Sequence, residues 1–200
     1  MERQDPKSRR NARVMTNRGR ASVVAVAALI LGGGACLFVP SGPERSHCIV
    51  TSIIVSASPA VAWNALKSFE TMSGDLPAAL ALGLPVPVQC TLDGEATGGR
   101  RVCHFDSGSI EQSVTRWEPP YRLELKIVSA KMPGAHVFEY RTASYSLSEE
   151  DGGTRVTRTT TISSKLRPAW YFTKLEEVGV QAEHEYLLKT IATRVREGKP

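Results

Sequence analysis

The sequence predicts an α+β fold, in which a curved antiparallel β-sheet wraps around a long C-terminal helix, preceded by a single transmembrane helix. Three observations lead to this prediction. Residues 21–40 carry no charged side chain. Residues 88–166 contain several short segments of alternating apolar and polar side chains, separated by turn sequences, as antiparallel strands do. Residues 169–197 repeat apolar side chains at helical spacing, and such a face must be buried against a curved sheet.

Residues 1–20 form a basic tail, and residues 21–40 are long enough to be a membrane anchor. Twenty residues of helix span roughly 30 Å, about the thickness of a hydrocarbon core. Because the basic residues precede the apolar segment, the N-terminus is expected in the cytoplasm and the C-terminal domain outside it, on the plasma (inner) membrane.

Three alternatives to a retained anchor remain open. Gly33 and Ala35 have the size and spacing of a signal-peptidase site. Cys36 ends a Gly-Gly-Ala-Cys sequence that resembles a lipoprotein signal, although Gly33 stands where such signals usually carry leucine. A buried helix of the domain is the third alternative. A retained anchor is favoured because the apolar run continues to Val39, past either cleavage point.

The charge distribution argues against nucleic-acid binding. The chain has 25 basic and 20 acidic residues, of which residues 1–20 hold seven basic and two acidic ones. The remainder therefore holds 18 of each, and it lacks the excess of positive charge that phosphate backbones require.

Residues 41–47 are predicted to be a short linker, and residues 48–197 to be the folded domain. The domain is expected to begin with a strand at 49–56. Ser58 and Pro59 then provide the cap and the first position of a short helix that runs to about residue 69. Residues 70–85 contain two prolines and two glycines, which allow only a helical turn or a loop.

The second half of the domain is predicted to be a run of strands followed by one helix. Pro119 and Pro120 make a corner between strands 109–117 and 122–129. Strands follow at 136–150 and after the turn at 151–154. The expected apolar face of the C-terminal helix consists of Tyr171, Leu175, Val178, Ala182, Leu188, Ile191 and Val195.

Cys90 and Cys103 are candidates for a disulfide. They flank an Asp-Gly and Gly-Gly turn, and a hairpin centred between Ala96 and Thr97 places them opposite each other. Opposite residues of antiparallel strands approach closely enough for a disulfide. The alternative is two buried thiols, since a one-residue bulge would break the register.

The chain resembles a known superfamily in four segments: SASPAVAWNAL, VTRWEPPYRLELKI, SLSEEDGGTRVTRTTTI and the final amphipathic helix. Their order and spacing are similar to the helix-grip, START-like (SRPBCC) superfamily, which includes polyketide cyclases and dehydrases. The resemblance covers residues 49–197. It implies a hydrophobic cavity for lipids, polyketides or sterols, and it implies no particular catalytic set.

The expected ligand pocket lies between the sheet and the C-terminal helix. Phe138 and Tyr140 share a strand face and are predicted to oppose Leu125 and Ile127 across a hairpin. Leu175 and Val178 of the C-terminal helix are predicted to face these strand residues. The candidate lining residues are Leu125, Ile127, Phe138, Tyr140, Leu175 and Val178. Plain core packing is the alternative interpretation, because pocket and core share one face in this architecture.

No catalytic residue, metal site or cofactor is predicted. The four histidines occur in no recognised catalytic or metal-binding pattern, and His184 lies in a charged stretch that is expected to be solvated. Glu139, Arg141 and Arg158 would form a site only if buried as a pair, and a solvated outer face is favoured.

The sequence therefore favours a membrane-anchored domain that binds a hydrophobic small molecule or lipid without catalysis. One alternative is an enzyme of the cyclase or dehydrase type acting on a hydrophobic substrate, which would need a buried acid or base with a displaced pKa. Another is an accessory subunit of a larger membrane complex, which would show a large exposed apolar patch.

Overall fold

The computed structural model describes residues 43–67, 71–72 and 74–198. Residues 41–200 form a compact unit of their own. The predicted membrane anchor at residues 21–40 lies outside the described residues, and none of the described helices is long and apolar enough to cross a bilayer.

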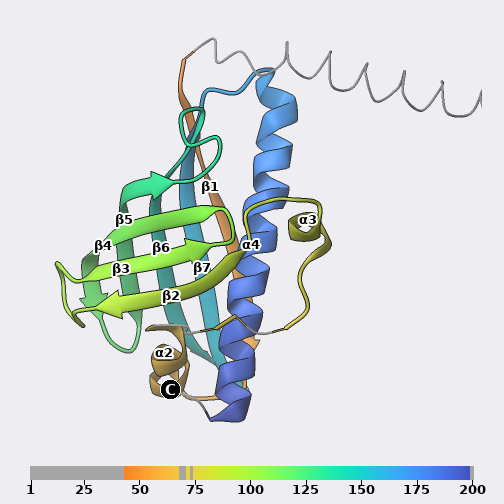
Figure 1. Ribbon diagram of the computed structural model, residues 1–200. Coiled ribbons are helices and arrows are strands. Elements are labelled where there is room, and N and C mark those ends of the chain that lie inside the picture. The colour runs from red at the N-terminus through yellow and green to blue at the C-terminus, as the bar shows by residue number, and fades with distance from the viewer. Residues whose placement is uncertain (1–42, 68–70, 73, 199–200) are drawn as a thin grey trace, which may run out of the picture. The chain divides into compact units, whose positions relative to one another are not determined.

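The domain contains one antiparallel sheet of seven strands and a long C-terminal helix (Figure 1). The strands are β1 (Arg45–Val55), β2 (Pro87–Asp93), β3 (Arg100–Phe105), β4 (Gly108–Glu118), β5 (Arg122–Lys131), β6 (Phe138–Glu150) and β7 (Gly153–Ser164). The helices are α2 (Pro59–Lys67), α3 (Ala78–Ala81) and α4 (Ala169–Glu197). The strand order β1-β7-β6-β5-β4-β3-β2 places the first strand beside the last.

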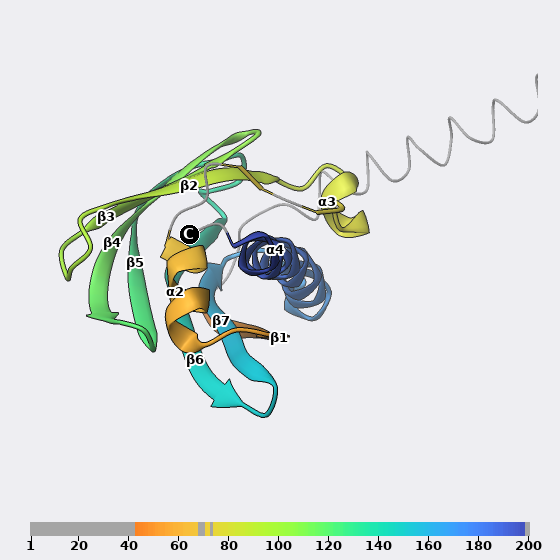
Figure 2. The ribbon, with the colours of Figure 1, turned by 90° about the horizontal axis from the view of Figure 1, so that it is seen from below.

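The sheet curls around α4 and α2, as the view along α4 shows (Figure 2). The expected sheet and C-terminal helix are therefore confirmed, in a helix-grip-like arrangement. Pro168 precedes α4, where a residue without an N–H is tolerated at the start of a helix. Gly198 ends α4 in the left-handed conformation with φ of 63°, which a glycine adopts without a Cβ clash.

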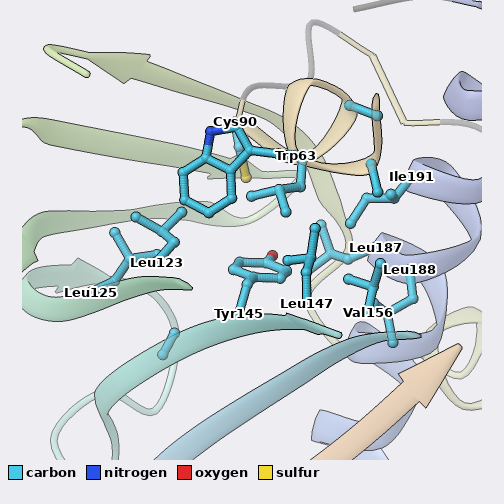
Figure 3. Close-up of a cluster of buried hydrophobic side chains, with 14 of the residues drawn as sticks. Trp63, Cys90, Leu123, Leu125, Tyr145, Leu147, Val156, Leu187, Leu188 and Ile191 are labelled. Atoms are coloured by element: carbon cyan, nitrogen blue, oxygen red, sulfur yellow. The ribbon is translucent and has the colours of Figure 1, made fainter. Parts of the chain in front are cut away.

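The main core lies between the concave face of the sheet and the two helices. Leu123, Leu125, Tyr145, Leu147 and Val156 of the sheet face Leu187, Leu188 and Ile191 of α4 (Figure 3). Trp63 of α2 closes one side, and its ring lies edge-on to that of Trp117 with centroids 4.9 Å apart. Burial of these large side chains contributes most of the stability of such a domain.

The predicted linker is shorter than expected, because β1 begins at Arg45. Arg45, Ser46 and His47 pair with Ser164, Ser163 and Ile162 of β7. Arg45 is also fixed to α4, since its guanidinium hydrogen-bonds to Thr173 and Glu176. These contacts explain why a segment with the composition of a linker is a strand.

The predicted apolar face of α4 was wrong for Tyr171, which is 44% exposed, and for Leu175 and Val178. Leu175 is 49% exposed and Val178 is 53% exposed. The face that meets the sheet instead carries polar side chains among the apolar ones: Phe172, Glu176, Val180, Glu183, His184, Leu187, Leu188 and Ile191. The outer side of α4 therefore carries apolar residues at the same helical spacing as a buried face, and the sequence pattern does not distinguish the two.

Candidate functional site

The concave face of the sheet carries two arginines among its apolar residues. Strand β7 buries Val156, Arg158, Thr160 and Ile162 in strict alternation, so Arg158 points inward with its apolar neighbours. Strand β3 likewise buries Arg101, which is fully inaccessible to solvent. A buried guanidinium is costly unless polar or aromatic groups surround it.

Arg158 is paired with Tyr145 and Glu183. Tyr145 is directly opposite Arg158 in the pairing of β6 with β7, and Arg158 donates a hydrogen bond to its hydroxyl. The other terminal nitrogen of Arg158 donates to Glu183 Oε1 at 2.9 Å. Glu183 Oε2 accepts from the Tyr140 hydroxyl at 2.9 Å, so both carboxylate oxygens are satisfied. We call Arg101, Tyr140, Tyr145, Arg158, Glu183 and His184 the buried polar cluster.

The ring of Tyr145 lies close to both guanidinium groups. The Cζ atom of Arg158 is 5.1 Å from the ring centroid, and that of Arg101 is 5.4 Å from it. These distances are within the range of cation–π interactions, which are strongest where water is excluded. One aromatic side chain therefore stabilises two buried cations.

This arrangement changes the proton affinities of the two tyrosines in opposite directions. Burial by itself raises the pKa of Tyr145, but the nearby Arg158 and Arg101 outweigh it and lower that pKa below its usual value. Burial and then the carboxylate of Glu183 raise the pKa of Tyr140 well above its usual value. Tyr145 is thus the tyrosine of the cluster that releases a proton more readily.

His184 was predicted to be solvated, and this prediction was wrong because the side chain is fully buried. One ring nitrogen lies 2.7 Å from Thr160 Oγ1, and the other lies 3.1 Å from Thr51 Oγ1. Burial, and then the positive charge of Arg158, lower the pKa of His184 to about 2. The imidazole is therefore neutral near pH 7, with one nitrogen donating and the other accepting.

Acidification is expected to destabilise the domain through His184. The pKa of this side chain is about 2 in the folded state and 6.5 as a free group. The unfolded chain therefore binds the extra proton below about pH 6.5, and stability falls as the pH falls. Between about pH 7 and pH 5 the loss due to His184 should be roughly 2 kcal/mol. Urea unfolding at both pH values measures it.

The matched control for this prediction is His184→Gln, whose amide can still hydrogen-bond to Thr51 and Thr160 but does not titrate. The variant should lose less stability than the wild type over the same pH interval. An equal loss in both proteins would contradict the assignment, because other groups would then account for all of the pH dependence.

The six predicted pocket residues do not form one group. Leu125 is buried in the main core, and Ile127 is packed against it. Phe138 instead packs against a second cluster of Ile49, Ile162 and Val180, and Tyr140 packs against both clusters.

The predicted pairing across the β5–β6 hairpin was wrong. Leu125 pairs with Ala143, whereas Phe138 and Tyr140 have their partners on β7. The cause is the register: β5 pairs with β6 only over Arg122–Lys126, and a bulge follows Tyr140. Of the six residues, only Tyr140 belongs to the buried polar cluster.

Cys90 and Cys103 are opposite each other in the pairing of β2 with β3, and a disulfide joins them. Both cysteines belong to the main core, and Cys103 is paired with Ile110 of β4. The bridge therefore joins the two strands of the edge hairpin covalently. Glu139 and Arg141 form an exposed ion pair and take no part in the site.

Sequence reasoning missed most of the buried polar cluster, although part of the signal was present. Arg101 stands two positions before Cys103, and Arg158 stands between Val156 and Thr160, on the inward side of each alternation. Glu183 and His184 lie four positions before Leu187 and Leu188, hence on the same face of α4. Because charged side chains are rarely buried, these inward positions were expected to be exposed to solvent.

The sequence matches the family model described as polyketide cyclase / dehydrase and lipid transport over residues 46–196. The chain belongs to this family. A search of curated proteins returned no match.

Solved structures show the same fold. Ara h 8.0201 is 10% identical with a TM-score of 0.50, over 76% of this chain and 99% of that one. A protein from Nitrosomonas europaea is 14% identical with a TM-score of 0.50, over 76% of this chain and 95% of that one. Identities this low support the shared fold alone.

In this family member the buried polar cluster combines groups that donate, accept and exchange protons. The Nε–H of Arg158 can donate to an oxygen-bearing ligand group, and Tyr145 can accept or release a proton. No group of three histidine, cysteine, aspartate or glutamate side chains among the described residues could hold a metal ion.

Proposed function

We propose that this domain binds a hydrophobic small molecule or lipid between its sheet and α4, and that residues 21–40 keep it at the membrane. The family description, which includes lipid transport, supports a ligand of this class. Leu123 and Leu125 of the sheet and Leu187 and Leu188 of α4 are buried in the main core, so a ligand bound between them would meet apolar side chains from both sides. The buried polar cluster would hold the polar end of the ligand.

The observation that carries this proposal is that two buried polar atoms have spare hydrogen-bonding capacity. Among the described residues, neither the Nε atom of Arg158 nor the Oε1 atom of Gln112 has a hydrogen-bond partner. Both side chains are buried on the concave face. Unsatisfied buried polar atoms are rare because each costs about 1–3 kcal/mol, so a ligand group that satisfies them would be strongly favoured.

Two features support the proposed location outside the cytoplasm. The basic residues precede the uncharged segment 21–40, which favours transfer of the following domain across the membrane. The disulfide between Cys90 and Cys103 is typical of proteins in an oxidising compartment. A tethered domain would hold its ligand at a high local concentration beside the bilayer.

The test is to find the ligand directly. Residues 41–200 form a compact unit, which can be exported, purified and examined by native and denaturing mass spectrometry. A stoichiometric hydrophobic passenger is the expected result, and its mass would identify the ligand class. A domain that is folded, empty and unable to take up lipids or polyketide mimics would contradict the proposal.

Replacement of Gln112 by leucine should separate ligand binding from folding. Leucine removes the unsatisfied amide oxygen from the concave face, so the free energy of unfolding should stay equal or rise. If the amide contacts the ligand, affinity should fall about tenfold, the effect of one lost hydrogen bond. Ligand titration and urea unfolding of the same two proteins measure both quantities. A leucine variant that retains full affinity would exclude Gln112 from the site.

A second candidate function is catalysis of the cyclase or dehydrase type. The observation in its favour is Tyr145, whose pKa the two arginines lower despite burial. Such a tyrosine could transfer a proton to or from a polyketide oxygen or carbon. Catalysis would be established if the wild type removed water from a supplied polyketide mimic and the Tyr145→Phe variant did not. An unchanged mimic that stays bound would leave binding as the function.

A further inference from the structure

The outer side of α4 carries an apolar stripe that faces away from the sheet and is exposed to solvent. Tyr171, Leu175 and Val178 are spaced by four and three positions and lie on one helix face, all of them exposed. This face is opposite the one that carries Phe172 and Val180 to the sheet. A helix with apolar residues on two sides requires a second apolar environment for the outer one.

The segment around α3 extends this apolar area. Leu82 and Leu84 follow α3, and Leu82 is 88% exposed. A Cβ atom on Gly179 of α4 would lie 3.2 Å from the Leu84 side chain, so the segment touches the helix there. A shallow hollow of about 230 Å³ between α3 and α4 is lined partly by Val178. We call Leu82, Leu84, Trp170, Tyr171, Leu175 and Val178 the outer apolar surface.

Two aromatic residues mark one end of this surface. Trp170 is 77% exposed, and its ring lies edge-on to that of Tyr171 with centroids 5.8 Å apart. The indole of Trp170 therefore presents a large apolar area to water. Tryptophan and tyrosine are also the side chains that concentrate at the boundary between lipid and water.

The start of the described chain lies at the same end. Arg45 donates hydrogen bonds to Thr173 and Glu176 in the first turns of α4, and Arg167 donates to the Pro43 carbonyl. Only residues 41–44 separate this end from the uncharged segment 21–40. Four residues reach at most about 14 Å even when fully extended. If segment 21–40 spans a bilayer, the start of α4 must therefore lie close to the bilayer surface.

We propose that the outer apolar surface rests in the interfacial layer of the membrane that holds segment 21–40, with Trp170 among the lipid headgroups. This inference rests on the membrane anchoring proposed above. Lipid is favoured over a protein partner because the short linker fixes this end near the bilayer, whatever else the membrane contains. The domain would then lie against the membrane with α3 and the start of α4 towards the lipid.

The experiment uses the full chain reconstituted in vesicles of phosphatidylcholine and phosphatidylglycerol. Flotation first establishes that the chain is bound to the vesicles. Tryptophan emission is then compared in ordinary vesicles and in vesicles whose lipids are brominated near the headgroups. Trp63 and Trp117 lie in and against the main core, so the difference between wild type and Trp170→Phe isolates Trp170. Bromolipid should quench the Trp170 emission, and aqueous iodide should have little effect on it.

A matched control places the indole at the far end of the domain. Tyr121 is half-exposed, and its carbonyl accepts from the Leu147 N–H at 2.9 Å. Leu147 pairs with Val156, and Ser164 at the other end of β7 pairs with Arg45. The stretch of β7 from Val156 to Ser164 spans about 26 Å, which separates Tyr121 from the end of the domain where Arg45 and the start of α4 lie. In the Trp170→Phe background, Tyr121→Trp should respond to iodide and not to bromolipid.

The outcomes separate this inference from the anchoring on which it rests. A chain that does not float with the vesicles would overturn the anchoring, and the inference with it. A chain that floats while Trp170 responds to iodide and not to bromolipid would overturn the inference alone and leave the anchoring intact. That second result would leave the surface open to water and available to a protein partner.

Discussion

Replacement of Glu183 by alanine is expected to lower the free energy of unfolding by about 3–5 kcal/mol, the cost of leaving a buried charge without its partner. The variant would deprive Arg158 of its carboxylate and the Tyr140 hydroxyl of its acceptor. Alanine is the best helix former, so the loss would not reflect the helix propensity of α4. Urea unfolding monitored by circular dichroism and fluorescence measures the change.

Two further variants show whether the buried charge is the cause. Replacement of both partners by apolar residues, Arg158→Met with Glu183→Leu, should recover much of the lost stability because no charge remains unpaired. Glu150→Ala removes the partner of Arg155 on the exposed surface and should change nothing measurable. If Glu183→Ala were as stable as Glu150→Ala, the proposed role of the buried pair would be wrong.

Replacement of Cys90 and Cys103 by alanine is expected to lower the free energy of unfolding by about 3 kcal/mol, the effect of a disulfide that closes a loop of this length. The two cysteines are 13 positions apart, and the bridge joins β2 at the sheet edge to β3. Without it the unfolded chain gains freedom, and the edge hairpin is held by strand pairing alone. Urea unfolding of the double variant measures the loss.

Cys48 supplies the control for the disulfide prediction. It is a free and exposed cysteine, so Cys48→Ser should unfold like the wild type. Wild-type protein treated with a reductant should resemble the double alanine variant, since both lack the bridge. Equal stability of the oxidised wild type and the double variant would contradict the prediction.

The fold was largely predictable because its strands and helix have local patterns. Period-two alternation in segments such as β5, with Leu123 and Leu125 facing inward, identified the strands without knowledge of their partners. The turn between Cys90 and Cys103 limited the register of one hairpin. The pairing of β1 with β7 and the register of β5 with β6 join distant segments, and no local pattern specifies them.

The buried polar cluster was only partly predictable because polar side chains have no fixed preference for the inside. The sequence around Glu183 and His184 is typical of a solvated stretch, yet in the fold Glu183 accepts from Arg158 of β7. His184 is hydrogen-bonded to Thr160 of the same strand. Leu175 and Val178 look like core residues, yet they face outward. Whether a charged side chain is buried depends on a partner that is distant in the sequence.

The sequence by itself therefore determined the class of fold, the order of its elements and the uncharged segment at residues 21–40. Those properties depend on periodicity and composition, which a single chain segment carries in full. Only the tertiary structure decided which face of α4 is buried, because the polar residues on that face need hydrogen-bond partners that the sheet provides. It also brought Arg158, Tyr145 and Glu183 together from three elements, since their mutual stabilisation exists only once the sheet has closed on the helix.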